Sequence, residues 1–234
     1  MKMMFLKTIW NDFSHLFFPH VCAGCGTDSI SPQSILCIHC MNQLPVTNFH
    51  LHANNPVEKH FWGRIPVASA TSLCHFTAGS LVQHLLHQLK YNGNKEAGFF
   101  LGRIMGTTLH LAERFRHIDA LVPLPLYAER QKKRGYNQSA VLCSGMAAVM
   151  QIPVTTSAVT RLSATETQTK KSRLDRWKNM EGKFELADPA SIAGKHILLV
   201  DDVVTTGATL EACGHELLKA ADVKLSIATL AYTV

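Results

Sequence analysis

A segment near the C-terminal end of the chain combines carboxylates, hydroxyls and a glycine in an order that suits phosphate chemistry. The apolar run 197–200 is followed by the acidic pair Asp201 and Asp202, and then by Thr205, Thr206, Gly207, Ala208 and Thr209. A loop between a buried strand and a helix directs backbone N–H groups and the positive end of the helix dipole at one point. Threonine hydroxyls add donors, and Gly207 lets the backbone approach a phosphate oxygen. Residues 201–209 therefore predict a phosphate-binding loop.

The acidic pair needs a partner of its own, because two adjacent carboxylates beside an anion site are unfavourable unless they bind hydroxyls or a cation. A ribose whose 5-phosphate occupies the loop would offer its 2- and 3-hydroxyls, with Mg²⁺ nearby on the same hydroxyls and on a pyrophosphate. Asp201 and Asp202 are thus the predicted catalytic residues. The segment lacks the lysine and the glycine spacing of a nucleoside-triphosphate P-loop. The alternative interpretation is an Asp-Asp turn followed by a Thr/Gly helix cap.

Two basic segments are expected at the same edge of the sheet. Arg130 and Arg134 lie in a loop that follows the predicted strand 120–126, and they are candidates for a pyrophosphate. Residues 161–183 carry seven basic and three acidic side chains. So polar a run cannot supply a core, and it suits a loop that closes over a charged ligand. A flexible surface loop is the other interpretation.

Four of the seven cysteines form two C-x-x-C pairs, which is typical of metal binding rather than of a secreted disulfide framework. Cys22, Cys25, Cys37 and Cys40 would hold one structural Zn²⁺ in a closed tetrahedral site. A redox dithiol is the weaker alternative, and His39 could displace one thiolate. The remaining cysteines lie in apolar patterns and are predicted to be ordinary buried residues: Cys74, Cys143 and Cys213.

The elements that must position these residues follow from apolar periodicity. Helices are expected over residues 4–18, 81–89 and 100–115, and residues 45–66 have no clear period and are interpreted as a linker. Beyond residue 119 strands alternate with helices, and the named strands are 120–126, 197–200 and 225–232. This order predicts an α/β fold with a mostly parallel sheet flanked by helices. A small N-terminal module, residues 1–45, would precede a main domain of residues 46–234.

Bulk properties narrow the class of protein. The chain has 234 residues, 47% of them hydrophobic, which is enough for a full-sized core. A formal charge of +6 attracts phosphate-rich partners without separating a small ligand from nucleic acid. No apolar span reaches membrane length, and polar residues interrupt the N-terminal stretch before a signal-peptide core could form. We therefore expect a cytoplasmic protein without membrane insertion.

Taken together, these motifs resemble two nested groups of proteins. Residues 201–209 are similar to the ribose-phosphate loop of type I phosphoribosyltransferases, and the whole set resembles the ComF family of competence-associated proteins, which includes GntX-like members. The matching segments are Cys22-x-x-Cys25, Cys37-x-x-Cys40, Leu89-Lys90-Tyr91-x-Gly93, Pro123-x-Pro125, Arg134-Gly135-Tyr136-Asn137-Gln138, Gln168-Thr169 and Arg173-x-x-Arg176-x-x-Asn179. The resemblance implies binding of phosphoribosyl pyrophosphate with Mg²⁺, to which Lys90, Gln168, Thr169, Arg173 and Arg176 would contribute. It also implies a role linked to DNA uptake in natural transformation.

Three functions remain open at this point. The first is an enzyme that transfers phosphoribose to an unidentified nitrogen acceptor. The second is a module that binds single-stranded DNA along the basic segments, and the third is a ligand sensor that controls a partner such as a DNA-uptake protein. The basic residues cluster where pyrophosphate would sit, which favours ligand binding, with transfer ahead of sensing.

Overall fold

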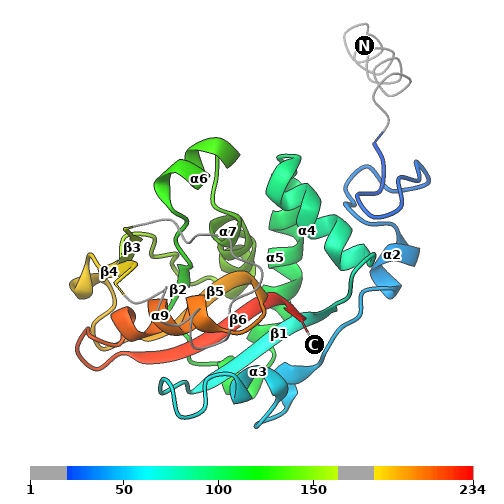
Figure 1. Ribbon diagram of the computed structural model, residues 1–234. Helices are drawn as coiled ribbons and strands as arrows, with labels where there is room; N and C mark the ends of the chain where they lie inside the picture. The colour runs from blue at the N-terminus through cyan, green and yellow to red at the C-terminus, as the bar shows by residue number, and fades with distance from the viewer. Residues whose placement is uncertain (1–19, 163–181, 234) are drawn as a thin grey trace, which may run out of the picture. The chain divides into compact units, whose positions relative to one another are not determined.

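The computed structural model describes residues 20–162 and 182–233, so the helix predicted over residues 4–18 lies outside the described residues. The chain divides into two compact units, Met1–Leu44 and Pro45–Val234 (Figure 1). None of the helices in the described residues is long and apolar enough to cross a membrane.

The described part of the first unit consists mainly of turns and one short helix, α2 (Ile38–Asn42). Cys37 caps this helix with its own sulfur, which accepts a hydrogen bond from the backbone N–H of Cys40. Apart from cysteines, the buried hydrophobic residues in the described part of this unit are Leu36 and Leu44. Two leucines cannot form a core that stabilises a fold by itself.

The second unit is built on a four-stranded parallel sheet, as the sequence predicts. Its strand order is β1 (Ser69–Phe76), β6 (Lys224–Thr233), β5 (His196–Val204) and β2 (Ala120–Pro123). A separate antiparallel pair joins β3 (Val159–Arg161) to β4 (Phe184–Leu186). Because all four strands of the main sheet run the same way, their carboxyl ends lie at one edge.

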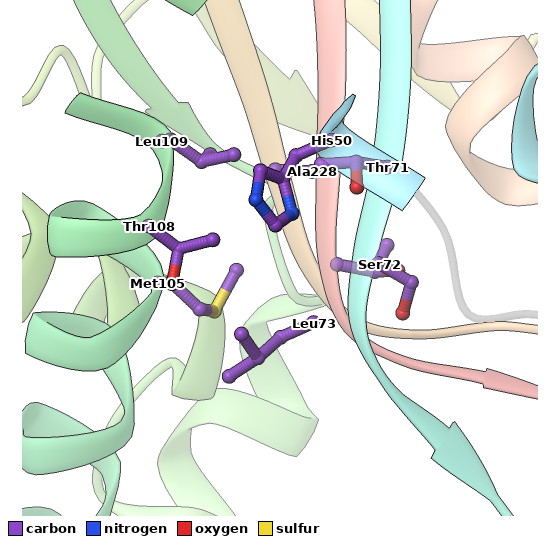
Figure 2. A pocket seen from close by; sticks show the side chains of 9 residues that line it. His50, Thr71, Ser72, Leu73, Met105, Thr108, Leu109 and Ala228 are labelled. Carbon is purple, nitrogen blue, oxygen red and sulfur yellow. The ribbon is translucent and has the colours of Figure 1, made fainter. Parts of the chain in front are cut away.

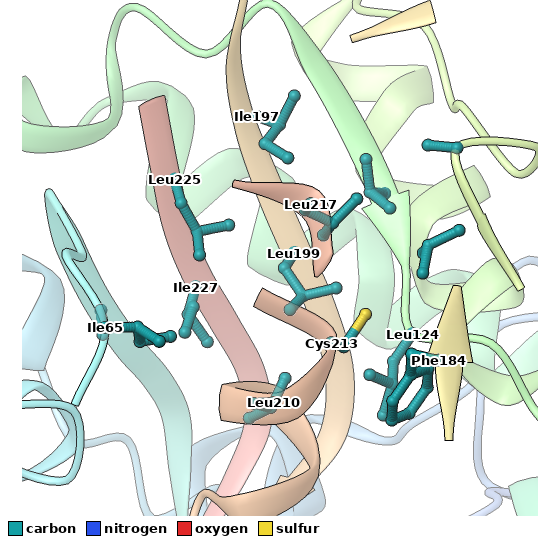
Figure 3. Close-up of a cluster of buried hydrophobic side chains, with 14 of the residues drawn as sticks. Ile65, Leu124, Phe184, Ile197, Leu199, Leu210, Cys213, Leu217, Leu225 and Ile227 are labelled. Carbon is teal, nitrogen blue, oxygen red and sulfur yellow. The ribbon is translucent and has the colours of Figure 1, made fainter. Parts of the chain in front are cut away.

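One face of the sheet packs against α9 (Ala208–Leu217). Ile197 and Leu199 of β5, with Ile227 of β6, point towards Leu210 and Leu217 of that helix (Figure 3). These side chains are at alternate strand positions and are almost fully buried. Leu198 and Val200, the intervening residues of β5, are also buried because helices cover the other face.

The other face carries α4 (Leu81–Tyr91), α5 (Lys95–His110) and α7 (Gln138–Met150) (Figure 1). The backbones of α5 and α7 approach each other closely, since a Cβ on Gly102 would lie 2.2 Å from the carbonyl oxygen of Leu142. A Cβ on Gly145 would lie 2.1 Å from the carbonyl oxygen of Phe99. Glycine is therefore required on both helices for this close approach.

The interpretation of residues 45–66 as a linker is wrong. This segment contains η1 (Phe49–Leu51) and α3 (Pro56–Lys59), and it contributes Phe61 to the core. Asn55 organises it: its side-chain oxygen caps α3, and its Nδ2 donates to the backbone carbonyls of Phe49, His52 and Ala70. A buried amide holds this segment in place, and such a contact leaves no apolar period in the sequence.

Several predicted boundaries differ from the observed ones. Strand β2 stops at Pro123 instead of residue 126, β5 runs on to Val204 instead of stopping at residue 200, and α5 begins at Lys95, where Asn94 caps it. The basic segment predicted as a loop after β2 forms a helix, α6 (Ala128–Arg134), which ends at Gly135 with a φ of 77°. The described residues also contain η2 (Glu113–Phe115) and η3 (Pro189–Ser191).

Candidate functional site

The four cysteines of the first unit form a compact cluster. The sulfur atoms of Cys22, Cys25, Cys37 and Cys40 all lie within 4.8 Å of one another, and those of Cys25 and Cys37 are 3.7 Å apart. Zinc–thiolate bonds of about 2.3 Å in a tetrahedron give sulfur–sulfur separations of about 3.8 Å. The donor set therefore fits a tetrahedral metal ion. His39 is exposed and does not belong to the cluster, so the idea that it displaces a thiolate gains no support.

Backbone N–H groups favour negative charge in this cluster. The sulfur of Cys22 accepts hydrogen bonds from the backbone N–H groups of Gly24, at 3.3 Å, and Cys37, at 3.2 Å. Burial raises the pKa of the Cys22 thiol, but backbone hydrogen bonds outweigh it and lower that pKa to about 6. Burial and the neighbouring sulfur atoms raise the pKa of Cys40. One thiol thus ionises readily, while four thiolates without a cation would repel one another.

Asp201 and Asp202 occupy the last part of β5 rather than the loop after it. Both are half-buried at the carboxyl edge of the sheet. The Asp201 carboxylate accepts a hydrogen bond from its neighbour's backbone N–H, with 2.8 Å between Asp202 N and Asp201 Oδ1. The pair therefore belongs to a fixed strand, with its side chains placed by the sheet rather than by a flexible turn.

Two other elements contact the acidic pair. Ser139, in the first turn of α7, donates its hydroxyl to Asp201 Oδ1 at 3.0 Å. Lys90, near the end of α4, places its Nζ 2.9 Å from Asp202 Oδ2. The structure thus brings together the predicted Asp201, Asp202 and Lys90. It adds Ser139, which was not predicted from the sequence. The available signal was Asn137, the N-cap of α7, whose side-chain oxygen accepts a hydrogen bond from the backbone N–H of Ser139.

The surroundings of Asp201 disfavour its charged form. Burial and the adjacent Asp202 carboxylate together raise the pKa of Asp201 to about 7, against the opposing effects of the Asp202 backbone N–H, Lys90 and Ser139. Burial deprives the charged carboxylate of hydrating water. A cation or a hydroxyl donor bound beside it would compensate for that loss and stabilise the charged form.

The loop itself is short. Thr205 is exposed, Thr206 and Thr209 are half-buried, and Ala208 is buried at the start of α9. Gly207 has a φ of 76°, and a Cβ there would lie 3.2 Å from the ring of Phe61. Any side chain at Gly207 is therefore strained as well as crowded. Residues 45–66, which were predicted as a linker, therefore support this loop through Phe61.

Arg134 and Gln138 form a second group of donors beside α7. Nη1 of Arg134 donates to Oε1 of Gln138 at 2.9 Å, across the turn between α6 and α7. This bond orients the Gln138 amide, whose Nε2 is buried and has no hydrogen-bond partner within the described residues. A buried donor without an acceptor is costly and suits an incoming oxygen ligand.

Arg130 and Arg161 also lie in this neighbourhood. Arg161, on β3, places its guanidinium carbon 5.2 Å from the ring centroid of Phe184. Burial lowers the pKa of Arg161, the charge of Arg130 lowers it further, and Asp201 raises it. In the sequence, Arg161 is only one of many basic residues between residues 161 and 183. Four other predicted ligand residues lie outside the described residues: Gln168, Thr169, Arg173 and Arg176.

A small pocket lies elsewhere, between α5 and the sheet (Figure 2). His50, Thr71, Met105 and Thr108 are among the residues that line it, and it includes none of the acidic pair or its loop. The buried hydroxyl of Thr71 has no hydrogen-bond partner in the described part of the chain. This pocket is separate from the candidate site.

The C-terminal part of the chain matches a known domain family. Residues 137–233 match the phosphoribosyl transferase domain family. An adenine phosphoribosyltransferase structure from Saccharomyces cerevisiae is similar with a TM-score of 0.35 and 19% identity, covering 56% of this chain and 66% of that chain. The matched residues include α7, β5, α9 and β6, the elements that carry the acidic pair and its contacts.

Relatives extend the similarity to nearly the whole chain. The DNA utilization protein YhgH of Escherichia coli K12 is 30% identical over 203 residues, covering 85% of this chain and 84% of its own. Competence protein F of Haemophilus influenzae is 28% identical over 214 residues, covering 88% and 87%. Competence protein ComFC of Bacillus subtilis is 31% identical over 144 residues, covering 62% and 56%. The chain therefore belongs to the ComF family of competence-associated proteins, with a phosphoribosyltransferase-like domain.

Proposed function

We propose that this protein binds phosphoribosyl pyrophosphate together with Mg²⁺ at the acidic pair and the loop after β5. One observation carries the proposal: a half-buried carboxylate pair, in which the pKa of Asp201 is raised to about 7, adjoins Gly207 at the start of α9 and at the carboxyl edge of a parallel sheet. This combination suits a ligand with hydroxyls next to a phosphate.

Each group has a separate task in this proposal. Asp201 and Asp202 hold the ribose hydroxyls, while Thr205, Thr206, Gly207, Ala208 and Thr209 surround the 5-phosphate. The pyrophosphate lies towards Lys90, Arg130 and Arg134, where the unpartnered Nε2 of Gln138 supplies a further donor. Gln168, Thr169, Arg173 and Arg176 are assigned to the same ligand through the family resemblance. Mg²⁺, when bound, offsets the charge of the pyrophosphate.

The reaction that fits this site is phosphoribosyl transfer. The bond from C1 of the ribose to the pyrophosphate oxygen breaks as a bond to an acceptor nitrogen forms, and the acceptor's proton passes to solvent. Basic side chains stabilise the departing pyrophosphate, and the acidic pair lies beside the developing positive charge on the sugar. The acceptor stays unassigned.

Calorimetric titration with phosphoribosyl pyrophosphate and Mg²⁺ tests the proposal. The double variant Asp201→Asn, Asp202→Asn should bind at least about tenfold more weakly, since it loses charged acceptors for ribose hydroxyls. Asp222→Asn is the matched control, because Asp222 is exposed, distant in sequence and in a left-handed conformation that asparagine tolerates. Wild-type affinity in the double variant would place the ligand elsewhere.

For the first unit we propose one structural Zn²⁺ held by Cys22, Cys25, Cys37 and Cys40. The sulfur separations and the backbone N–H bonds to sulfur support it. The ion would satisfy four thiolates that otherwise repel one another, and a cytoplasmic, reducing setting would keep them free of disulfides.

A second candidate function is binding of single-stranded DNA, in the context of DNA uptake. Two relatives are named for DNA utilization and for competence. In this chain α6 carries Arg130, Lys132, Lys133 and Arg134 against the single acidic Glu129, a charge balance that attracts a phosphate backbone. Binding without turnover, as a ligand-controlled sensor, is the corresponding alternative to transfer.

A further inference from the structure

Tyr91, the last residue of α4, is an exposed aromatic ring beside the candidate site. It is 65% exposed, and the guanidinium carbon of Arg134 lies 5.5 Å from its ring centroid. The ring of His87, one helical turn earlier, lies 4.8 Å away at 42°. We call His87, Tyr91 and Arg134 the Tyr91 stack.

The neighbouring residues tie this stack to the site. Leu89 accepts a hydrogen bond at its carbonyl from the hydroxyl of Tyr136, and Lys90 pairs with Asp202. The last three residues of α4 therefore each have a different contact: Leu89 binds Tyr136 just before α7, Lys90 binds the acidic pair, and Tyr91 packs against Arg134 of α6. The position of Tyr91 is fixed, although its ring is open to solvent.

A second exposed aromatic ring allows a comparison within the molecule. Trp62 is 57% exposed, and Nζ of Lys59 lies 5.9 Å from its ring centroid. Charges near it are balanced, because Arg64 pairs with Glu211 and Glu58 pairs with Arg114. An exposed aromatic ring next to a cation is thus present twice, in different electrostatic surroundings.

The surroundings of the Tyr91 stack are strongly basic. Lys132 and Lys133 of α6 are exposed next to Arg134, and exposed Lys95 places its Nζ 5.0 Å from the ring centroid of Tyr136. Exposed cations beside an aromatic face complement a chain that alternates phosphates with flat rings. An unpaired base offers its face to such a ring, whereas bases in a duplex are already stacked on one another.

We infer that the Tyr91 stack and the basic side of α6 form a binding surface for single-stranded nucleic acid. One base stacks on Tyr91, whose ring Arg134 supports, and Lys132 and Lys133 contact the adjacent phosphates. The inference rests on the DNA-binding part of the proposed function and adds the location and the mode of recognition. Residues outside the described part of the chain are not needed for it.

Fluorescence anisotropy with labelled oligothymidylate tests the surface in the full-length protein. Tyr91→Ala should weaken binding by about tenfold, the effect expected from one lost base–aromatic stack, and Tyr91→Phe should restore most of the affinity. Trp62→Ala is the matched control and should bind as wild type does. Both alanine variants change exposed side chains, and circular dichroism checks that they fold.

Two further measurements separate stacking from charge. On an abasic strand of equal length, Tyr91→Ala should bind as the wild type does, because no base remains to stack. The variant Lys132→Gln, Lys133→Gln should make the negative slope of log affinity against log salt shallower by about 1.4, whereas Tyr91→Ala should leave that slope unchanged. Repeating the titration with oligouridylate shows whether RNA shares the surface.

The outcomes distinguish binding of single-stranded DNA by this protein from the location of that binding at the Tyr91 stack. If the wild type binds the strand and Tyr91→Ala binds equally well, the stacking surface is wrong while DNA binding stands. If the wild type binds no single strand, both fail, and an acidic protein partner becomes the occupant to test. Binding of phosphoribosyl pyrophosphate is measured separately and is unaffected by either result.

Discussion

The two units of this protein are stabilised in different ways. Apart from its cysteines, the described part of the first unit buries Leu36 and Leu44, and its remaining buried groups are thiols that repel one another when ionised. The second unit buries a continuous apolar cluster between β5, β6 and α9 (Figure 3). Burial of this kind contributes roughly 25 cal/mol for each Å² of apolar surface removed from water.

This difference decides what each unit can tolerate. If the proposed zinc site is correct, the described part of the first unit, with two buried leucines, depends on the metal for its fold. The second unit has enough apolar burial to carry Asp201, whose pKa is raised to about 7 because burial and Asp202 disfavour its charge. Substitution of the binding residues should therefore have opposite effects on stability in the two units. Loss of the cysteines should unfold the first unit, whereas loss of the Asp201 carboxylate should stabilise the second.

The largest expected effect is loss of the first unit on removal of its metal ligands. The variant Cys22→Ser, Cys25→Ser should lose about one equivalent of zinc and the ordered structure of this unit, because the proposed ion would link segments that bury few apolar side chains. Metal analysis and limited proteolysis measure both changes, with cleavage confined to residues before Pro45. Cys74→Ser changes a buried cysteine outside the cluster and should keep the zinc. Full protease resistance of the double variant without metal would contradict the comparison.

A smaller effect is expected at the loop of the second unit. Gly207→Val forces a branched residue to a φ of 76° and crowds Phe61, so it should destabilise the unit by about 3 kcal/mol in urea denaturation. Gly194→Val is the control, because Gly194 has a φ of 70° and nothing lies within 4 Å of an added Cβ. It should cost about 1 kcal/mol less and leave binding of phosphoribosyl pyrophosphate intact. Equal losses of stability and affinity would show that Phe61 does not support the loop.

Elements with a buried apolar run or with local ligand spacing could be predicted from the sequence, and elements without either could not. Strands β2, β5 and β6 were predicted because each contains a buried apolar run, and the four cysteines because metal spacing is local. Helix α6 was missed because none of its residues is buried, so it has no apolar period. Strand β1 was not named, since it carries buried Ser69, Thr71 and Ser72 among its apolar residues.

Contacts of the candidate site were predictable only in part. The acidic pair and Gly207 are adjacent in the sequence, whereas Ser139 and Lys90 reach the pair from distant helices. Phe61 lies under Gly207 because Asn55 and Glu58 bind backbone groups of β1, which no local pattern shows. Residues that touch the ligand can thus be identified from type and spacing, but residues that position them require the fold.

The smallest expected effect is a gain of stability in Asp201→Asn. The folded-state pKa of Asp201 is raised to about 7, so the native protein binds a proton that the unfolded chain has already released above its ordinary pKa. The contribution of this group is fully present below the unfolded pKa and is lost as the pH rises through about 7. Asparagine carries no charge at any pH and keeps a similar shape. The free energy of unfolding of Asp201→Asn should therefore exceed that of the wild type at pH 8, and the difference should shrink towards pH 5.

Urea denaturation of both proteins at pH 5, 6, 7 and 8 measures this difference, and titrating groups distant from Asp201 cancel because they are common to the two chains. Asp222→Asn, at an exposed position, should show no such pH-dependent gain. If Asp201→Asn were instead less stable than the wild type at pH 8, the hydrogen bonds from Ser139 and Asp202 would outweigh the cost of burial. The acidic pair would then stabilise the second unit, as the proposed zinc site would stabilise the first, and the contrast between the units would be lost.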